Sequence, residues 1–133
     1  MKKMFKLIEI QNDLLRFESL DGSEIAEIFS DHFQECREEH YLDFTPLSVE
    51  DFEGLIFDLH SDNFFERVEE YGIRLVSIDN QRISIAGYAH NNGHYSDKLT
   101  LVIRIKKYNG QNCEVITKEY DITSCQYNRY VDW

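Results

Sequence analysis

Apolar and polar positions alternate along most of the chain with a period of two, which is typical of β-strands that bury one face. The alternation is clearest over residues 99–106, where leucine or isoleucine occupies every second position. The same criterion predicts further strands at residues 3–10, 14–19, 24–29, 73–78, 82–86 and 113–122. The pattern therefore predicts a chain that is rich in β-structure.

Short turn sequences separate these strands and predict how they pair. Asp21-Gly22 and Asn109-Gly110 are strong hairpin signals, because these residue types tolerate the positive φ angles of tight turns. Asp79–Gln81 and Asn91–Gly93 are further turn candidates. We therefore expect an N-terminal hairpin and, from residue 73 onward, an antiparallel meander of four strands.

The middle of the chain follows a helical period instead. Ser48, with Glu50 and Asp51 after it, predicts the start of a short helix, because a hydroxyl and early carboxylates suit a helix N-terminus. Apolar residues recur at helical spacing between Ser61 and Gly72, which predicts a second helix. The second half of residues 31–44 is interpreted as an edge strand or an extended loop.

These elements together predict an α+β fold. Its single, mainly antiparallel sheet would combine the N-terminal hairpin with the C-terminal meander, and one or two short helices would be inserted midway. A length of 133 residues, 42% of them apolar, suits one domain spanning residues 1–133.

The cysteines and the hydropathy pattern indicate where the protein acts. Cys36, Cys113 and Cys125 are an odd set without a CxxC pair, which favours the cytoplasm over a secreted, disulfide-bonded state. No stretch approaches the roughly 18 apolar residues that a membrane span needs, so we expect no membrane partner.

Negative charge is concentrated in the middle of the chain. The net charge is −11, and residues 17–72 contain seventeen Asp and Glu against only Arg37 and Arg67. Such a surface disfavours direct binding of nucleic acid and favours a basic protein surface, including that of a nucleic-acid-binding target. We expect these carboxylates to share one exterior patch. The residues predicted to bind the partner are Asp31, Glu35, Glu38, Glu39, Asp43, Glu50, Asp51, Glu66, Glu69 and Glu70.

One segment contains candidate metal ligands. His32, Cys36 and His40 are spaced four residues apart, which places them on one side of a helix or strand. Imidazole and thiolate are good zinc ligands, although the spacing matches no established zinc motif. The competing interpretation is an acidic surface segment with incidental histidines, and it is the favoured one. We therefore expect the protein to bind no cofactor, and zinc is the alternative.

The loop His90–Ser96 is the other polar constellation, and it suits a small ligand or a partner better than catalysis. Residues of one exposed turn rarely hold the ordered geometry of a Ser-His-Asp triad, and Ser96 lacks the glycines of a nucleophile elbow. We therefore predict that the protein is not an enzyme.

Residues 30–44 and 93–103 resemble those of an uncharacterised family of small domains found largely in phages and prophages. Members combine a His-Asp-Cys-Cys-Glu-like segment with a Gly-Tyr-Tyr-Ser turn. The counterparts here are His32 with Cys36 and Glu38 or Glu39, and then Gly93–Asp97. The chain departs from the pattern at Cys36-Arg37, which replaces the cysteine pair. The resemblance implies a gene of a mobile element and no particular activity.

Two hypotheses follow from these features. The first is an acidic inhibitor, anti-defence or immunity-type module that covers a basic surface of a target protein. The alternative is a small-ligand- or metal-binding domain that uses the His32/Cys36/His40 segment or the His90–Ser96 loop. Such a domain could be a monomer or an oligomer.

Overall fold

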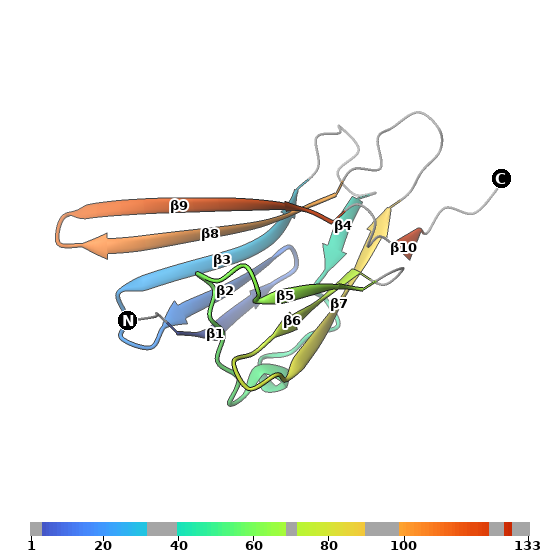
Figure 1. Ribbon diagram of the computed structural model, residues 1–133, viewed down its shortest axis with the longest axis horizontal. Coiled ribbons are helices and arrows are strands. Elements are labelled where there is room, and N and C mark those ends of the chain that lie inside the picture. The colour runs from blue at the N-terminus through green and yellow to red at the C-terminus, as the bar shows by residue number, and fades with distance from the viewer. Residues whose placement is uncertain (1–3, 32–39, 69–71, 90–98, 123–126, 129–133) are drawn as a thin grey trace.

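The computed structural model describes residues 4–31, 40–68, 72–89, 99–122 and 127–128, which form two β-sheets (Figure 1). The first sheet has the order β1-β2-β3-β8-β9, and all of its neighbouring strands are antiparallel. Its strands are β1 (Phe5–Gln11), β2 (Leu14–Ser19), β3 (Glu24–Asp31), β8 (Thr100–Asn109) and β9 (Asn112–Asp121).

The second sheet has the order β10-β7-β6-β5, and β4 also pairs with β7. Its pairs are antiparallel except for β10, which lies parallel to β7. A single turn of 3-10 helix, η2 (Val49–Phe52), lies between β4 and β5. The strands are β4 (His40–Asp43), β5 (Phe65–Val68), β6 (Gly72–Val76), β7 (Arg82–Ala89) and β10 (Tyr127–Asn128).

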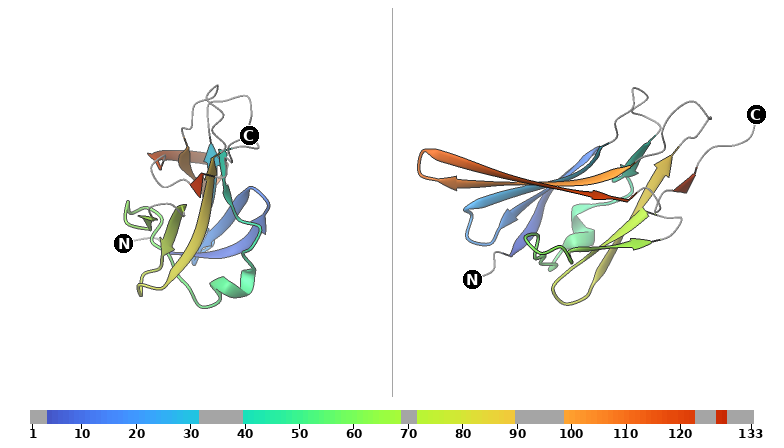
Figure 2. Two further views of the ribbon diagram at one scale, coloured as in Figure 1. Left: turned by 90° about the vertical axis from the view of Figure 1, so that its right-hand side faces the viewer. Right: turned by 45° about the horizontal axis from the view of Figure 1, so that its top comes forward.

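Figure 2 shows the two sheets from two further sides. Side chains of both sheets contribute to one hydrophobic core. The ring of Phe17 in β2 meets Phe57 and Phe52 edge-on, with centroids 5.5 and 6.3 Å apart. Phe5 of β1 exchanges two backbone hydrogen bonds of 2.9 Å with Phe57, which fixes the segment after η2 against the first sheet. Burial of these large rings, together with the aliphatic side chains of the same core, stabilises the fold.

Most strands predicted from alternation are confirmed. The predicted ranges overlap β1, β2, β3, β6, β7, β8 and β9. Of the two alternatives for the second half of residues 31–44, an edge strand or an extended loop, the structure has a strand, β4. Gly22 and Gly110 have φ angles of 76° and 65°, as the two predicted hairpin turns require.

The prediction of an α+β fold is wrong, because the described residues contain no α-helix. The first predicted helix is only the turn η2, which ends before Gly54 at a φ of 79°. The second is replaced by β5, which pairs with β6. Phenylalanine and valine favour strands, and an isolated helix of this length is marginal in water, so pairing with β6 prevails over helical spacing. None of the described helical residues forms a helix with the length and apolar character needed to cross a membrane.

The prediction of a single sheet is also wrong. The hairpin β6–β7 belongs to the second sheet and the hairpin β8–β9 to the first, so the expected four-strand meander is divided between them. β8 pairs with β3 instead of β7, in a register that runs from Glu24↔Lys107 to Asp31↔Thr100. The predicted turn at Asn91–Gly93 lies outside the described residues.

Candidate functional site

Much of the predicted site lies outside the described residues. This applies to His32 and Cys36, to the loop His90–Ser96, and to the carboxylates Glu35, Glu38, Glu39, Glu69 and Glu70. Asp31 and His40 are placed by their backbones alone, at the end of β3 and the start of β4. Zinc binding and the family resemblance therefore stay predictions. In the part of the chain that is described, no group of three or more metal-binding side chains converges.

The strand register brings the ends of the two predicted loops together. Asp31 pairs with Thr100, and His40 pairs with Ala89. The end of β3 therefore lies beside the start of β8, and the start of β4 lies beside the end of β7.

Four of the predicted partner-binding carboxylates have described side chains, and three of these have local structural roles. Asp43 accepts hydrogen bonds from the amide and hydroxyl of Thr45, at 3.0 and 2.6 Å. Asp51 accepts one of 2.9 Å from the amide of Ser48 and so caps η2. Glu66 bonds Arg82 at 2.7 Å and Arg74 at 3.4 Å, and the hydrogen bond from Arg82 is the main reason why its pKa is lowered.

The expected single acidic patch is interrupted by an ion cluster on the outer face of the first sheet. Glu27 of β3 is only 5% exposed and lies 3.1 Å from Arg16, 3.8 Å from Arg104 and 3.5 Å from Lys106. Its hydrogen bond is the main cause of the raised pKa of Arg16. Adjacent strands thus supply three cations to one buried carboxylate, and this part of the acidic charge is neutralised internally.

A second buried carboxylate contacts a histidine. Glu24 is 2% exposed, and its Oε1 lies 2.7 Å from Nε2 of His60, whose ring is 5.7 Å from that of Phe5. A carboxylate that orients an imidazole is one part of a nucleophilic site. Ser61 follows His60 in the sequence, but its hydroxyl accepts a hydrogen bond of 2.9 Å from the backbone amide of Asn63. The pair therefore holds residues 58–64 against β3 and lacks the order of a catalytic triad.

Asp62 forms a third interaction between the same loop and β9. It accepts a hydrogen bond of 2.6 Å from the hydroxyl of Tyr120 and lies 3.5 Å from the ammonium of Lys118. These contacts, the tyrosine first, lower the pKa of Asp62. Partial burial, and then the bond to Asp62, raise the pKa of Tyr120, so its neutral phenol is the form that the fold favours.

This raised pKa predicts how stability depends on alkaline pH. The stabilisation should be complete below the unfolded-state pKa of about 10 and should be lost as pH rises towards the folded-state value. We expect the free energy of unfolding to fall above pH about 10, and less steeply in Tyr120→Phe. Urea denaturation at a series of pH values would measure this. Tyr108→Phe is the matched control, because Tyr108 is 51% exposed. Equal slopes in wild type and Tyr120→Phe would contradict the assignment.

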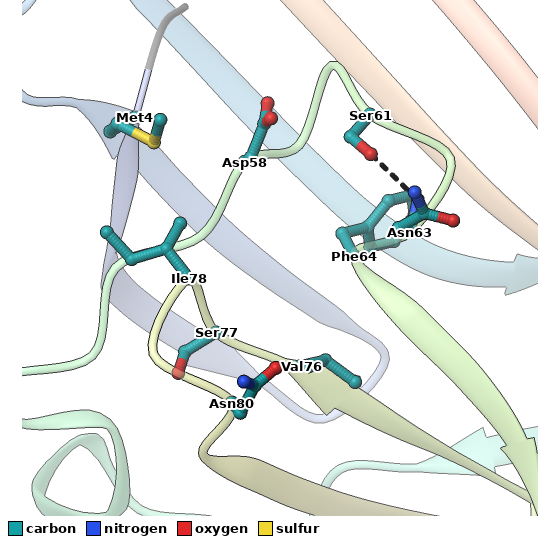
Figure 3. A pocket seen from close by; sticks show the side chains of 9 residues that line it. All are labelled: Met4, Asp58, Ser61, Asn63, Phe64, Val76, Ser77, Ile78 and Asn80. Atoms are coloured by element: carbon teal, nitrogen blue, oxygen red, sulfur yellow. Dashed lines mark hydrogen bonds between the residues drawn. The ribbon is translucent and has the colours of Figure 1, made fainter.

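A hollow of about 350 Å³ lies between the loop 58–64 and the turn after β6 (Figure 3). Two of its hydroxyl groups bond to neighbouring residues of the same two turns. Ser61 binds Asn63 as described, and the hydroxyl of Ser77 accepts the amide of Gln81 at 3.0 Å and contacts Asp79. Side chains that fix two turns have little capacity left for a ligand, and we assign no chemistry to this hollow.

The acidic segment, residues 43–54, has a different character. It contains Asp43, Glu50, Asp51 and Glu53 and no lysine or arginine. Its apolar side chains anchor it, because Phe44 and Phe52 are buried in the core. Glu50, Asp51 and Glu53 are exposed, and among the described residues no cation forms an ion pair with them.

An apolar hollow of about 360 Å³ opens beside the acidic segment. It is lined by Lys6 and Leu7 of β1 and by most of residues 49–56. Val49 at its rim is 50% exposed. An apolar recess with a rim of unpaired carboxylates can take an apolar side chain that basic residues flank. Sequence reasoning identified Glu50 and Asp51, but it missed Glu53 and the recess, which needs β1 as its second wall.

Comparisons with family models, with curated proteins and with solved structures find no match to the chain.

Proposed function

We propose that the protein is a non-enzymatic binding module that acts in the cytoplasm and covers a basic surface of a target protein, as an inhibitor, anti-defence or immunity protein would. The acidic segment and the apolar hollow beside it form the binding surface. The observation that supports this choice is the contrast between carboxylates. Glu27 and Glu66 are ion-paired within the fold, whereas Glu50 and Glu53 are exposed without such partners.

Unpaired charge at an exposed rim mainly accelerates association and selects the partner, and its effect weakens as salt screens it. Buried apolar anchors supply most of the affinity in typical protein interfaces. The proposed surface offers both, because Glu50 and Glu53 line the same recess as the apolar side chains of Leu7, Phe52 and Leu55. A target segment with an apolar side chain between lysines or arginines would match it.

Titration with a labelled peptide that has one leucine flanked by lysines and arginines tests the proposal. We expect Glu50→Lys combined with Glu53→Lys to weaken binding about tenfold, and binding by the wild type to weaken with added salt. Asp13→Lys combined with Glu119→Lys is the matched control, because both residues are exposed and the net charge changes equally. If both double variants lose the same affinity, the peptide senses only overall charge and the proposed surface is wrong.

A further inference from the structure

β9 is a long edge strand with one open side. Its ten residues pair with β8 in an uninterrupted register from Thr100↔Asp121 to Asn109↔Asn112. Among the described strands, none pairs with its other side. Residues 112–117 are all exposed, and they include Val115 at 54% and Ile116 at 36%. An apolar edge of this kind tends to accept another strand.

The other described edge strands are short or irregular, whereas β9 is long and regular; β4 has four residues and β10 has two. β1 has an irregularity between Leu7 and Glu9, and its backbone is bonded to Phe57. β5 is only four residues long. Natural sheets protect their edges by bulges, short strands, proline, charged side chains or covering segments. Of these devices, β9 has charged side chains, at Glu114, Lys118, Glu119 and Asp121. β9 contains no proline or glycine, and its pairing with β8 has no bulge.

One hydrogen bond shows which backbone groups of β9 point outward. The amide of Ile122 donates to the carbonyl of Leu99 at 3.0 Å, so this opposed pair is a hydrogen-bonded one. Such pairs alternate in antiparallel sheets, and even-numbered residues of β9 therefore face β8 with their backbone groups. The amides and carbonyls of residues 113, 115, 117 and 119 point away. The carbonyl of Asp121 also points away from β8, and it accepts a hydrogen bond of 3.1 Å from the guanidinium of Arg67.

We propose that β9 pairs antiparallel with β9 of a second copy, about a two-fold axis at Ile116. In an antiparallel pair, residues that face each other have the same backbone orientation, so the axis must pass through a residue position. Centring on Ile116 places Glu114 opposite Lys118 of the second copy, twice. Centring on Glu114 or Lys118 would oppose like charges, and centring on Val115 or Thr117 would leave Glu114 opposite isoleucine or tyrosine.

The side chains suit this register. Ile116 and its copy would form a non-hydrogen-bonded pair, in which side chains approach most closely, and Val115 would face Thr117. Lys118 already donates to the carbonyl of His60 at 2.8 Å and lies 3.5 Å from Asp62, and an ammonium has a third N–H that Glu114 of the second copy can accept. One pair of strands buries less than a standard interface, so the dimer should be weak. This inference does not rest on the proposed function, because it uses a different surface.

Sedimentation equilibrium of the full chain, from low to high micromolar concentration, tests the pairing by a charge swap. We expect a reversible dimer in the wild type. Glu114→Lys or Lys118→Glu alone should raise its dissociation constant about tenfold, since two attractive pairs become repulsive. The double variant should restore dimerisation, because lysine again faces glutamate. Circular dichroism confirms that each variant is folded. A wild type that stays monomeric, or a double variant no better than the singles, would overturn the proposal, including the case in which β9 accepts a strand of another protein.

A disulfide at the axis gives an independent readout. In the proposed register, the Cα atoms of the two Ile116 residues lie about 4.5 Å apart, within disulfide range. The two Cys113 residues lie roughly 20 Å apart. Oxidation should therefore cross-link Ile116→Cys in a background in which Cys36, Cys113 and Cys125 are replaced by serine. It should not cross-link that background alone, which is the control, nor the wild type through Cys113. Cross-linking that is equal in the variant and the control would contradict the register.

Discussion

Replacing Gly72 by alanine is expected to destabilise the protein by about 3–5 kcal/mol, a large part of the roughly 5–15 kcal/mol by which an ordinary domain is stable. Gly72 starts β6 at a φ of 99°, and a Cβ atom there would lie 2.2 Å from the carbonyl oxygen of Ile85 and 2.5 Å from the amide nitrogen of Gly87. Both are backbone atoms of β7, so neither can move without breaking the β6–β7 pairing. The strained φ angle adds to the cost.

Gly54→Ala is the matched control for this substitution. Gly54 has a φ of 79°, and a Cβ atom there would meet no atom within 4 Å. Only the backbone conformation is then penalised, by about 1 kcal/mol. Urea denaturation of both variants separates the two causes. A Gly72→Ala protein as stable as Gly54→Ala would contradict the close approach of β6 and β7.

Replacing Glu27 by glutamine is expected to cost about 2–3 kcal/mol of unfolding free energy, a large effect for a substitution of similar shape. The change leaves the cations of Arg16, Arg104 and Lys106 around one site without their shared carboxylate. Their side chains are 33%, 41% and 33% exposed, so solvent screens part of the repulsion and the estimate is lower than for a fully buried pair.

The control for Glu27→Gln is Glu119→Gln, which removes an exposed carboxylate from the same sheet. Its effect should stay within about 0.5 kcal/mol. Added salt should reduce the difference between the two variants, because it screens the repulsion among the cations. Equal stability of the two variants in urea denaturation would mean that the cluster does not contribute to the fold.

The individual strands could be predicted because each one carries its own pattern of buried and exposed positions. β8 shows the principle, since its alternating apolar residues are those that fill the core. The pairing of β3 with β8 could not be predicted, because Glu24 and Lys107 are far apart in the sequence and no turn joins them. Local signals therefore gave the strands but not their division between two sheets.

The region of β5 shows why a helical spacing can mislead. Phe64 and Phe65 fit one face of a helix, yet consecutive aromatic residues can also be buried together at the start of a strand. Both rings pack on Tyr120, with centroids 5.8 and 5.0 Å away. That contact joins β5 to the far end of the chain. Whether a short segment forms a helix or a strand depends more on such packing against distant residues than on the spacing of its own apolar positions.

The sequence predicted the negative charge of the candidate site, but it did not predict which of the carboxylates form ion pairs within the fold. Residue counts locate the carboxylates, but they do not show which ones the fold neutralises. The partners of Glu27 come from β2 and β8, and that of Glu24 from the loop after η2. Only the topology reveals that these acids are used internally. The acidic segment remained a surface because its own sequence supplies no cation.

The proposal that residues 43–54 and the adjacent hollow bind a basic partner can be examined amide by amide. A two-dimensional NMR titration of the ¹⁵N-labelled protein with the leucine-centred basic peptide would locate the contact. The predicted shift changes are confined to residues 43–56 and to Lys6 and Leu7, and at equal peptide concentration they are smaller in the Glu50→Lys, Glu53→Lys variant, whose affinity is about tenfold lower. Shift changes centred elsewhere, or spread evenly over all exposed carboxylates, would contradict the proposal.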